Sequence, residues 1–107
     1  MGKINSRQKG AAGERQWASY CREQGFDARR GQQFKGTADS PDVVSESMKA
    51  FHAEVKRVER LDLQGAMDKA IMEAGDKIPY VAHRRNNHDW LVTMKAEDFF
   101  RLVREYI

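Results

Sequence analysis

Apolar residues recur with helical spacing in three segments of the chain and follow shorter, strand-like patterns between them. The first predicted helix begins at Ser6, a residue type that caps helices, and ends at Gly25, which tolerates a left-handed backbone. The second spans residues 61–74, where Asp62 favours the helix start through the dipole, and the third spans residues 95–106.

The segments between these helices predict five strands, at residues 26–34, 42–46, 50–58, 78–83 and 90–94. The clearest alternation lies in residues 50–58, where His52, Glu54 and Lys56 fall on one face and apolar side chains on the other. The element order is α-β-β-β-α-β-β-α. A three-strand meander followed by a helical crossover predicts an α/β fold with a mixed five-stranded sheet flanked by helices.

The length of 107 residues suits one domain, residues 1–107, with residues 1–5 as a flexible basic arm. No apolar run approaches the ~20 residues that a membrane span needs, and the polar start lacks the apolar stretch of a secretory signal. Cys21 is the only cysteine, so no intrachain disulfide can form. A single thiol at a helical position predicts core packing in a reducing cytoplasm.

Charge is unevenly distributed along the chain, although the net charge is only +3. Residues 1–35 carry eight Lys/Arg and three Asp/Glu, residues 36–76 carry five and nine, and residues 77–107 carry six and four. Basic ends around an acidic middle are typical of a protein that holds a polyanion beside divalent cations. The alternative is a solvated ionic surface with chance clustering.

Two acidic motifs lie about a dozen residues apart. The first is Pro41-Asp42, at the start of a strand, and the second is Glu54-Val55-Lys56. Glu54 and Lys56 are two positions apart on a strand, so they point to the same face at ~6–7 Å. Pairing of the neighbouring strands would bring the Asp42 carboxylate beside Glu54.

Two carboxylates and an ammonium group suit the hydrolysis of a phosphodiester. Mg²⁺ prefers oxygen ligands and keeps several waters, so Asp42, Glu54 and the Val55 carbonyl would form a sufficient protein ligand set. The metal polarises a phosphate oxygen and acidifies a bound water, while Lys56 can orient that water or neutralise charge in the transition state. The plain alternatives are an ion pair between Glu54 and Lys56 and a strand that simply begins at Asp42.

The motif pair is similar to that of the PD-(D/E)-x-K nuclease superfamily. Residues 9–15, Lys-Gly-Ala-Ala-Gly-Glu-Arg, resemble the opening of archaeal-type Holliday junction resolvases and their phage relatives. In those enzymes a helix glutamate completes the metal site, and Glu14 is the matching position. Residues 54–57, 83–85 and 90–92 resemble the phage branch, and the resemblance spans nearly the whole chain in the expected order.

This resemblance implies a restriction-endonuclease-like fold, Mg²⁺ dependence with Mn²⁺ as a substitute, a homodimer, and branched DNA as the substrate. It implies that Glu14, Asp42, Glu54 and Lys56 are the catalytic residues. If the protein comes from a phage, the resemblance also implies that it acts in the cytoplasm of a bacterial host. Archaeal members have a serine after the arginine of the first strand, where this chain has Gly31. A glutamine often follows on the next helix, and both Gln64 and Lys69 are candidates for its place.

Further residues are candidates for auxiliary roles. His52 shares the face of Glu54 and is either an edge residue of the site or a structural histidine. Nine basic residues are candidates for phosphate contacts, each against the alternative of plain solubility. They are Arg7, Lys9, Arg15, Arg29, Arg30, Lys35, Arg57, Arg84 and Arg85.

Three functions remain open from the sequence. The first is a homodimeric resolvase of branched DNA. The second is a nuclease of the same chemistry that nicks other duplex or flap DNA, and the third is a catalytically idle DNA-binding domain. Two tryptophans and two phenylalanines, expected in the core or at a dimer surface rather than stacked on bases, are Trp17, Trp90, Phe99 and Phe100.

Overall fold

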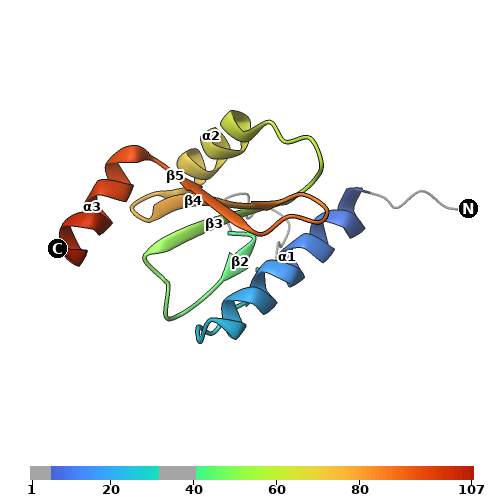
Figure 1. Cartoon of the computed structure of the whole chain (residues 1–107), viewed down its shortest axis with the longest axis horizontal. Helices are drawn as coiled ribbons and strands as arrows, with labels where there is room; N and C mark the ends of the chain where they lie inside the picture. Colours follow the sequence, from blue (N-terminus) through green and yellow to red (C-terminus); the bar gives the residue numbers. More distant parts are fainter. Residues whose placement is uncertain (1–5, 32–40) are drawn as a thin grey trace, which may run out of the picture.

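The computed structural model describes residues 6–31 and 41–107, without the side chains of residues 6–9. Three helices and five strands follow the predicted order (Figure 1). They are α1 (Ser6–Glu23), β1 (Arg29–Arg30), β2 (Val43–Val44), β3 (Phe51–Arg57), α2 (Leu63–Ala74), β4 (Ile78–Arg84), β5 (Leu91–Met94) and α3 (Ala96–Tyr106).

The strands form one sheet in the order β1-β2-β3-β4-β5. The β1, β2 and β3 strands form an antiparallel meander, in which Val43 is the partner of Ala53. Helix α2 then carries the chain across to β4, which runs parallel to β3, and β5 returns antiparallel to β4. The mixed sheet expected from the meander and the crossover helix is therefore confirmed.

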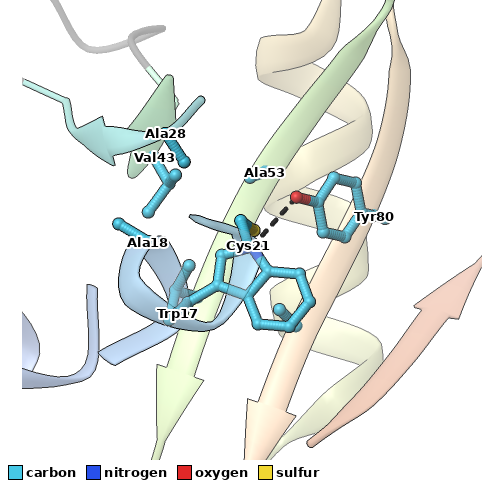
Figure 2. Close-up of a cluster of buried hydrophobic side chains, with 9 residues drawn as sticks. Trp17, Ala18, Cys21, Ala28, Val43, Ala53 and Tyr80 are labelled. Atoms are coloured by element: carbon cyan, nitrogen blue, oxygen red, sulfur yellow. Dashed lines mark hydrogen bonds between the residues drawn. The ribbon is translucent and has the colours of Figure 1, made fainter. Parts of the chain in front are cut away.

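Helix α1 covers one face of the sheet with a tightly packed apolar cluster (Figure 2). Trp17, Ala18 and Cys21 point from the helix onto strand residues such as Ala53, and the Trp17 Nε1–H donates to the Tyr80 hydroxyl at 3.0 Å. Cys21 is buried as packing material, as predicted. A side chain at Gly13 would put its Cβ 2.7 Å from the Cβ of Arg57, so glycine lets α1 approach the end of β3.

Helix α2 covers the opposite face, where Ala66, Met67 and Ala70 pack on Val81 of β4. Asp62 begins this helix by accepting a hydrogen bond from the Gly65 N–H at 3.0 Å. The alternation of β3 is confirmed, but its polar face is not solvated. Because α2 lies over that face, two ionisable side chains of β3 are buried beneath it, which sets up the site described below.

The predicted strand at residues 26–34 is much shorter in the part that the structure describes. Only Arg29 and Arg30 pair with β2, because Asp27 turns its carboxylate to the β2–β3 connection and accepts hydrogen bonds from the N–H groups of Glu46 and Ser47. Residues 1–5 and 32–40, which include the end of the first predicted strand and Lys35, lie outside the described residues. Asn87, in the turn before β5, has a φ of 62°.

Helix α3 extends away from the sheet at the C-terminal end of the chain (Figure 1). Only Asp98 of this helix is buried, whereas Phe99 and Phe100 are each 52% exposed and contact one another edge to face. The helix therefore carries apolar surface that the rest of the described chain leaves exposed. Among the described residues no helix combines the length and the apolar character that crossing a bilayer requires.

Candidate active site

The backbone of Asp42 is held on both sides at the entrance to β2. Its N–H donates to the Ala53 carbonyl at 2.9 Å, and its own carbonyl accepts from the Gly31 N–H at 2.8 Å. Its carboxylate turns to β3, where Oδ2 accepts a hydrogen bond from the Val55 N–H at 2.8 Å. The acid of the first motif therefore lies against the middle residue of the second motif, as the sequence predicted.

Asp42 and Glu54 are both buried, with 5% and 1% of their surfaces exposed. Burial raises the pKa of Asp42 to about 7, and the negative charge of Glu54 contributes further, with a smaller contribution from Glu14. The hydrogen bond from the Val55 N–H acts in the opposite direction. Two neighbouring buried carboxylates repel one another, so the site electrostatically favours a cation.

Two lysines reach Glu54 from different elements. The Nζ of Lys56, on the same strand, lies 3.7 Å from Glu54 Oε2. The Nζ of Lys69, on α2, lies 3.0 Å from Oε2 and 3.3 Å from Oε1. Partial burial lowers the pKa of Lys69, but the hydrogen bond to Glu54 and the acidic neighbours outweigh it, so the pKa is raised overall.

The structure distinguishes the two helix candidates, Gln64 and Lys69, by position. Gln64 is exposed, and its Nε2 donates to Asp68 Oδ1 at 2.9 Å on the outer side of α2. Lys69 lies on the side that faces β3 and contacts Glu54. Of the two candidates, Lys69 is therefore the one that contacts Glu54.

Glu14 lies at the border of this cluster. Its Oε1 accepts a charge-assisted hydrogen bond from Arg30 Nε at 2.8 Å, so α1 is tied to β1 at this point. Its charge acts on Asp42, but within residues 6–31 and 41–107 no three carboxylate, histidine or cysteine side chains are close enough together to hold a metal as they stand. The structure thus brings Asp42, Glu54 and Lys56 together and pairs Glu14 with Arg30.

His52 is buried on the same face of β3 as Glu54, with 2% of its surface exposed. Its Nε2 lies 3.7 Å from Glu73 Oε1 of α2, too far for a hydrogen bond, and has no other partner among the described residues. Burial lowers the pKa of His52, while the charges of Glu73 and Glu54 oppose that shift. His52 therefore lies beneath α2 beside the site, out of contact with solvent.

The donor atoms at the site fit a hard divalent cation. Asp42 and Glu54 offer carboxylate oxygens, and because the N–H and C=O of one strand residue face the same neighbour, the Val55 carbonyl also points to the side of Asp42. Oxygen donors of this kind suit Mg²⁺ or Mn²⁺, and a Mg²⁺ site needs only one or two protein carboxylates beside its waters. The repulsion that raises the Asp42 pKa would be relieved by such an ion.

The nine basic residues proposed for DNA contacts differ in exposure and in whether the protein itself binds their side chains. Arg15, Arg29 and Arg85 are exposed. Arg57 Nε donates to Gln16 Oε1 at 3.1 Å, and Arg84 Nε donates to the His88 carbonyl at 2.6 Å, so both are held by the protein itself. The side chains of Arg7 and Lys9, and Lys35 as a whole, lie outside the described residues.

His83 is half-buried on β4, beside β5. Its Nε2 lies 2.9 Å from Thr93 Oγ1, on the strand that pairs with β4. Burial lowers the pKa of His83.

A profile of the archaeal Holliday junction resolvase (Hjc) family matches residues 5–99. A comparison with curated protein sequences gives no match. A solved structure of Archaeoglobus fulgidus Hjc, described as a Holliday junction resolvase from an archaeal hyperthermophile, is similar with a TM-score of 0.60 and 23% identity.

That alignment covers 80% of this chain and 72% of the archaeal one, and it shows the same fold. The family match spans the glutamate of α1, both acidic motifs and the sheet that joins them. The chain therefore belongs to the archaeal Holliday junction resolvase (Hjc) family of the PD-(D/E)xK superfamily.

Proposed function

We propose that this protein is a Mg²⁺-dependent endonuclease that selectively cuts branched DNA. Membership of the Hjc family implies a nuclease. The observation that carries the proposal is the pairing of two buried acids: the carboxylate of Asp42 is hydrogen-bonded to Val55, the residue that separates Glu54 from Lys56. Mg²⁺, or Mn²⁺ in its place, would be held by Asp42, Glu54 and the Val55 carbonyl.

Each residue of the site has a distinct task in this proposal. A divalent cation bound there supplies Lewis acidity, which activates a phosphate oxygen and a water. Asp42 and Glu54 would hold that cation in place, because both are buried and Asp42 is anchored at its backbone. Lys56, whose side chain is partly exposed, faces the substrate and compensates the charge that develops on the phosphate.

Glu14 is proposed as the third acid of the site. Arg30 now holds its carboxylate, and both residues lie on the segments that border Asp42. A phosphate that attracts the Arg30 guanidinium would release Glu14 for the cation, since guanidinium pairs with phosphate as readily as with carboxylate. The side chain of Glu14 is only 12% exposed, so it lies against the protein beside the site.

A homodimer would place two such sites on one branched substrate. The surface proposed for the dimer combines β5 and α3, where Val92, Phe99 and Phe100 are exposed. It continues into an apolar pocket of about 170 Å³ on the α1 face of the sheet, lined in part by Trp17 and Tyr80. Two-fold symmetry then lets the protein nick opposing strands of a junction symmetrically.

The test is cleavage of a four-way junction in Mg²⁺, compared with plain duplex and flap DNA. The wild type is expected to cut the junction preferentially, whereas Glu54→Gln, which keeps the side-chain shape, should lose cutting and retain junction binding in Ca²⁺. Glu46→Gln, at an exposed acid outside the site, is the matched control. Cutting by Glu54→Gln contradicts the proposed site, and equal cutting of duplex DNA contradicts the proposed substrate.

A further inference from the structure

Glu54 is among the least exposed side chains in the described part of the chain, and two ammonium groups lie against it. The contact with Lys69 is the closer one, and it involves both carboxylate oxygens, at 3.0 and 3.3 Å. These are the same oxygens that a divalent cation would use. Lys69 therefore contacts both of the oxygens that a divalent cation would need.

Glu54 needs a positive charge nearby because its side chain is buried. A buried carboxylate without a counter-charge is strongly destabilising, because burial removes the water that would otherwise stabilise its charge. Lys56, at 3.7 Å from one oxygen only, makes the weaker contact with Glu54. Lys69 therefore supplies the closer positive charge that a metal ion would otherwise bring.

Lys69 also has a second acidic partner within reach on α2. Its side chain is 46% exposed, so the ammonium group is not locked in place. Glu73 lies one helical turn farther along α2, and its negative charge also acts on Lys69. The ammonium can therefore leave one oxygen of Glu54 and remain close to an acidic partner.

We propose that Lys69 is a positioning residue that serves as the internal counter-ion of Glu54 in the metal-free protein and releases the carboxylate when a divalent cation binds. The inference rests on the metal site of the proposed function. It adds a competition: each cation that binds must displace the contact between Lys69 and Glu54. The ion pair keeps the site assembled before the metal arrives, and in return it lowers the affinity for the metal.

The competition fixes the sign of the expected effects. In Lys69→Met, which keeps the length of the side chain but removes its charge, the metal-free protein should unfold at a lower temperature. Mg²⁺ should then raise the unfolding midpoint more than it does in the wild type, because among the described residues only the weaker contact with Lys56 offsets the charge of Glu54 before the ion binds. The dissociation constant for Mg²⁺ should fall roughly tenfold, the change that ~1.4 kcal/mol produces.

The experiment measures unfolding midpoints in EDTA and in Mg²⁺ at constant ionic strength, together with Mg²⁺ binding by calorimetry, for the full chain. Lys69→Arg, which keeps the charge, should behave like the wild type. Lys49→Met is the control, because Lys49 is exposed and its partner Glu46 is exposed as well. A Mg²⁺-linked shift in Lys69→Met that is equal to or smaller than that of the wild type overturns the inference, as does weaker Mg²⁺ binding.

If Lys69→Met does not fold in EDTA, circular dichroism during a Mg²⁺ titration replaces the midpoint. Recovery of the fold by Mg²⁺ but not by Na⁺ at the same ionic strength supports the inference, and failure of Mg²⁺ to restore the fold contradicts it. The two proposals fail differently. If Mg²⁺ does not shift the unfolding midpoint of the wild type, the proposed metal site is contradicted. If the wild type shifts and Lys69→Met shifts equally, only the proposed counter-ion role of Lys69 is contradicted.

Discussion

The carboxylate of Asp42 accepts a hydrogen bond from the backbone N–H of Val55 at 2.8 Å, although the two residues lie thirteen positions apart in the chain. Strand β2 is only two residues long, so the edge of β3 beyond it has backbone groups without a strand partner. The Asp42 side chain satisfies one of them. The same bond that completes the sheet edge also aims the acid at the site.

Gly31 is expected to be essential for the position of Asp42. A Cβ at residue 31 would lie 2.1 Å from the backbone oxygen of Pro41, so Gly31→Ala must move the Pro41–Asp42 segment. We predict a loss of about 1–3 kcal/mol in the free energy of unfolding, measured in urea, together with reduced junction cleavage.

The matched control for this substitution is Gly10→Ala in α1. Nothing lies within 4 Å of the Cβ that it would add, and alanine favours the helix. Gly10→Ala should therefore stabilise the protein by about 0.5–1 kcal/mol. Wild-type stability in Gly31→Ala would show that the segment around Asp42 is not tightly held.

The buried charge of Asp42 predicts a pH-dependent stability of the metal-free protein. Its pKa of about 7 in the folded state exceeds the ordinary value of about 4 in the unfolded state. The folded state therefore binds more protons between these values, and this contribution to stability is lost as pH rises from about 4 through 7.

Asp42→Asn should remove this pH-dependent loss of stability. The amide oxygen can still accept a hydrogen bond from the Val55 N–H, but the side chain carries no charge. The stability difference between Asp42→Asn and the wild type should grow with pH across this window, by at most ~1.4 kcal/mol per pH unit. Urea unfolding in EDTA from pH 4 to 9 measures it. A difference that does not vary with pH contradicts the raised pKa.

Arg85 is exposed in the turn before β5 and is predicted to contact a DNA phosphate. Arg85→Ala should weaken junction binding in Ca²⁺ and reduce the slope of log affinity against log salt by about one. Lys49→Ala, near the other end of β3, should leave both quantities unchanged. An unaltered salt slope in Arg85→Ala would remove this residue from the proposed DNA surface.

The exposed phenylalanine rings of α3 predict a dimer in solution that dissociates when a charge is placed among them. Phe99→Glu places a charge in the proposed dimer surface, so sedimentation should give a dimer for the wild type and a monomer for the variant. Met72→Glu, at an exposed apolar residue of α2, should leave the dimer intact. A monomeric wild type, or a dimer that survives Phe99→Glu, contradicts the proposed surface.

Much of the fold could be predicted from local patterns. The caps at Asp62 and Gly75 and the alternation of β3 are encoded in short segments, so the order of elements followed from the sequence. The length of β1 could not be predicted, because Asp27 leaves the strand pattern for hydrogen bonds with residues about twenty positions away. Contacts of that kind depend on the folded backbone.

The site, like the fold, could be predicted from the sequence only in part. The approach of Asp42 to the Glu54 motif could be predicted, since strand pairing alone brings them together. The contact of Lys69 with Glu54 could not, because it depends on which side of α2 faces the sheet and how close the helix lies. The burial of His52 was also hidden, since alternation shows a polar face but not the helix that covers it.

The most direct test of the metal site is anomalous diffraction from a crystal of the protein soaked in Mn²⁺. We expect a peak at about 2.0–2.2 Å from carboxylate oxygens of both Asp42 and Glu54, with Lys69 displaced from at least one oxygen of Glu54. An empty map at those carboxylates, or a manganese peak held by other residues, would contradict it.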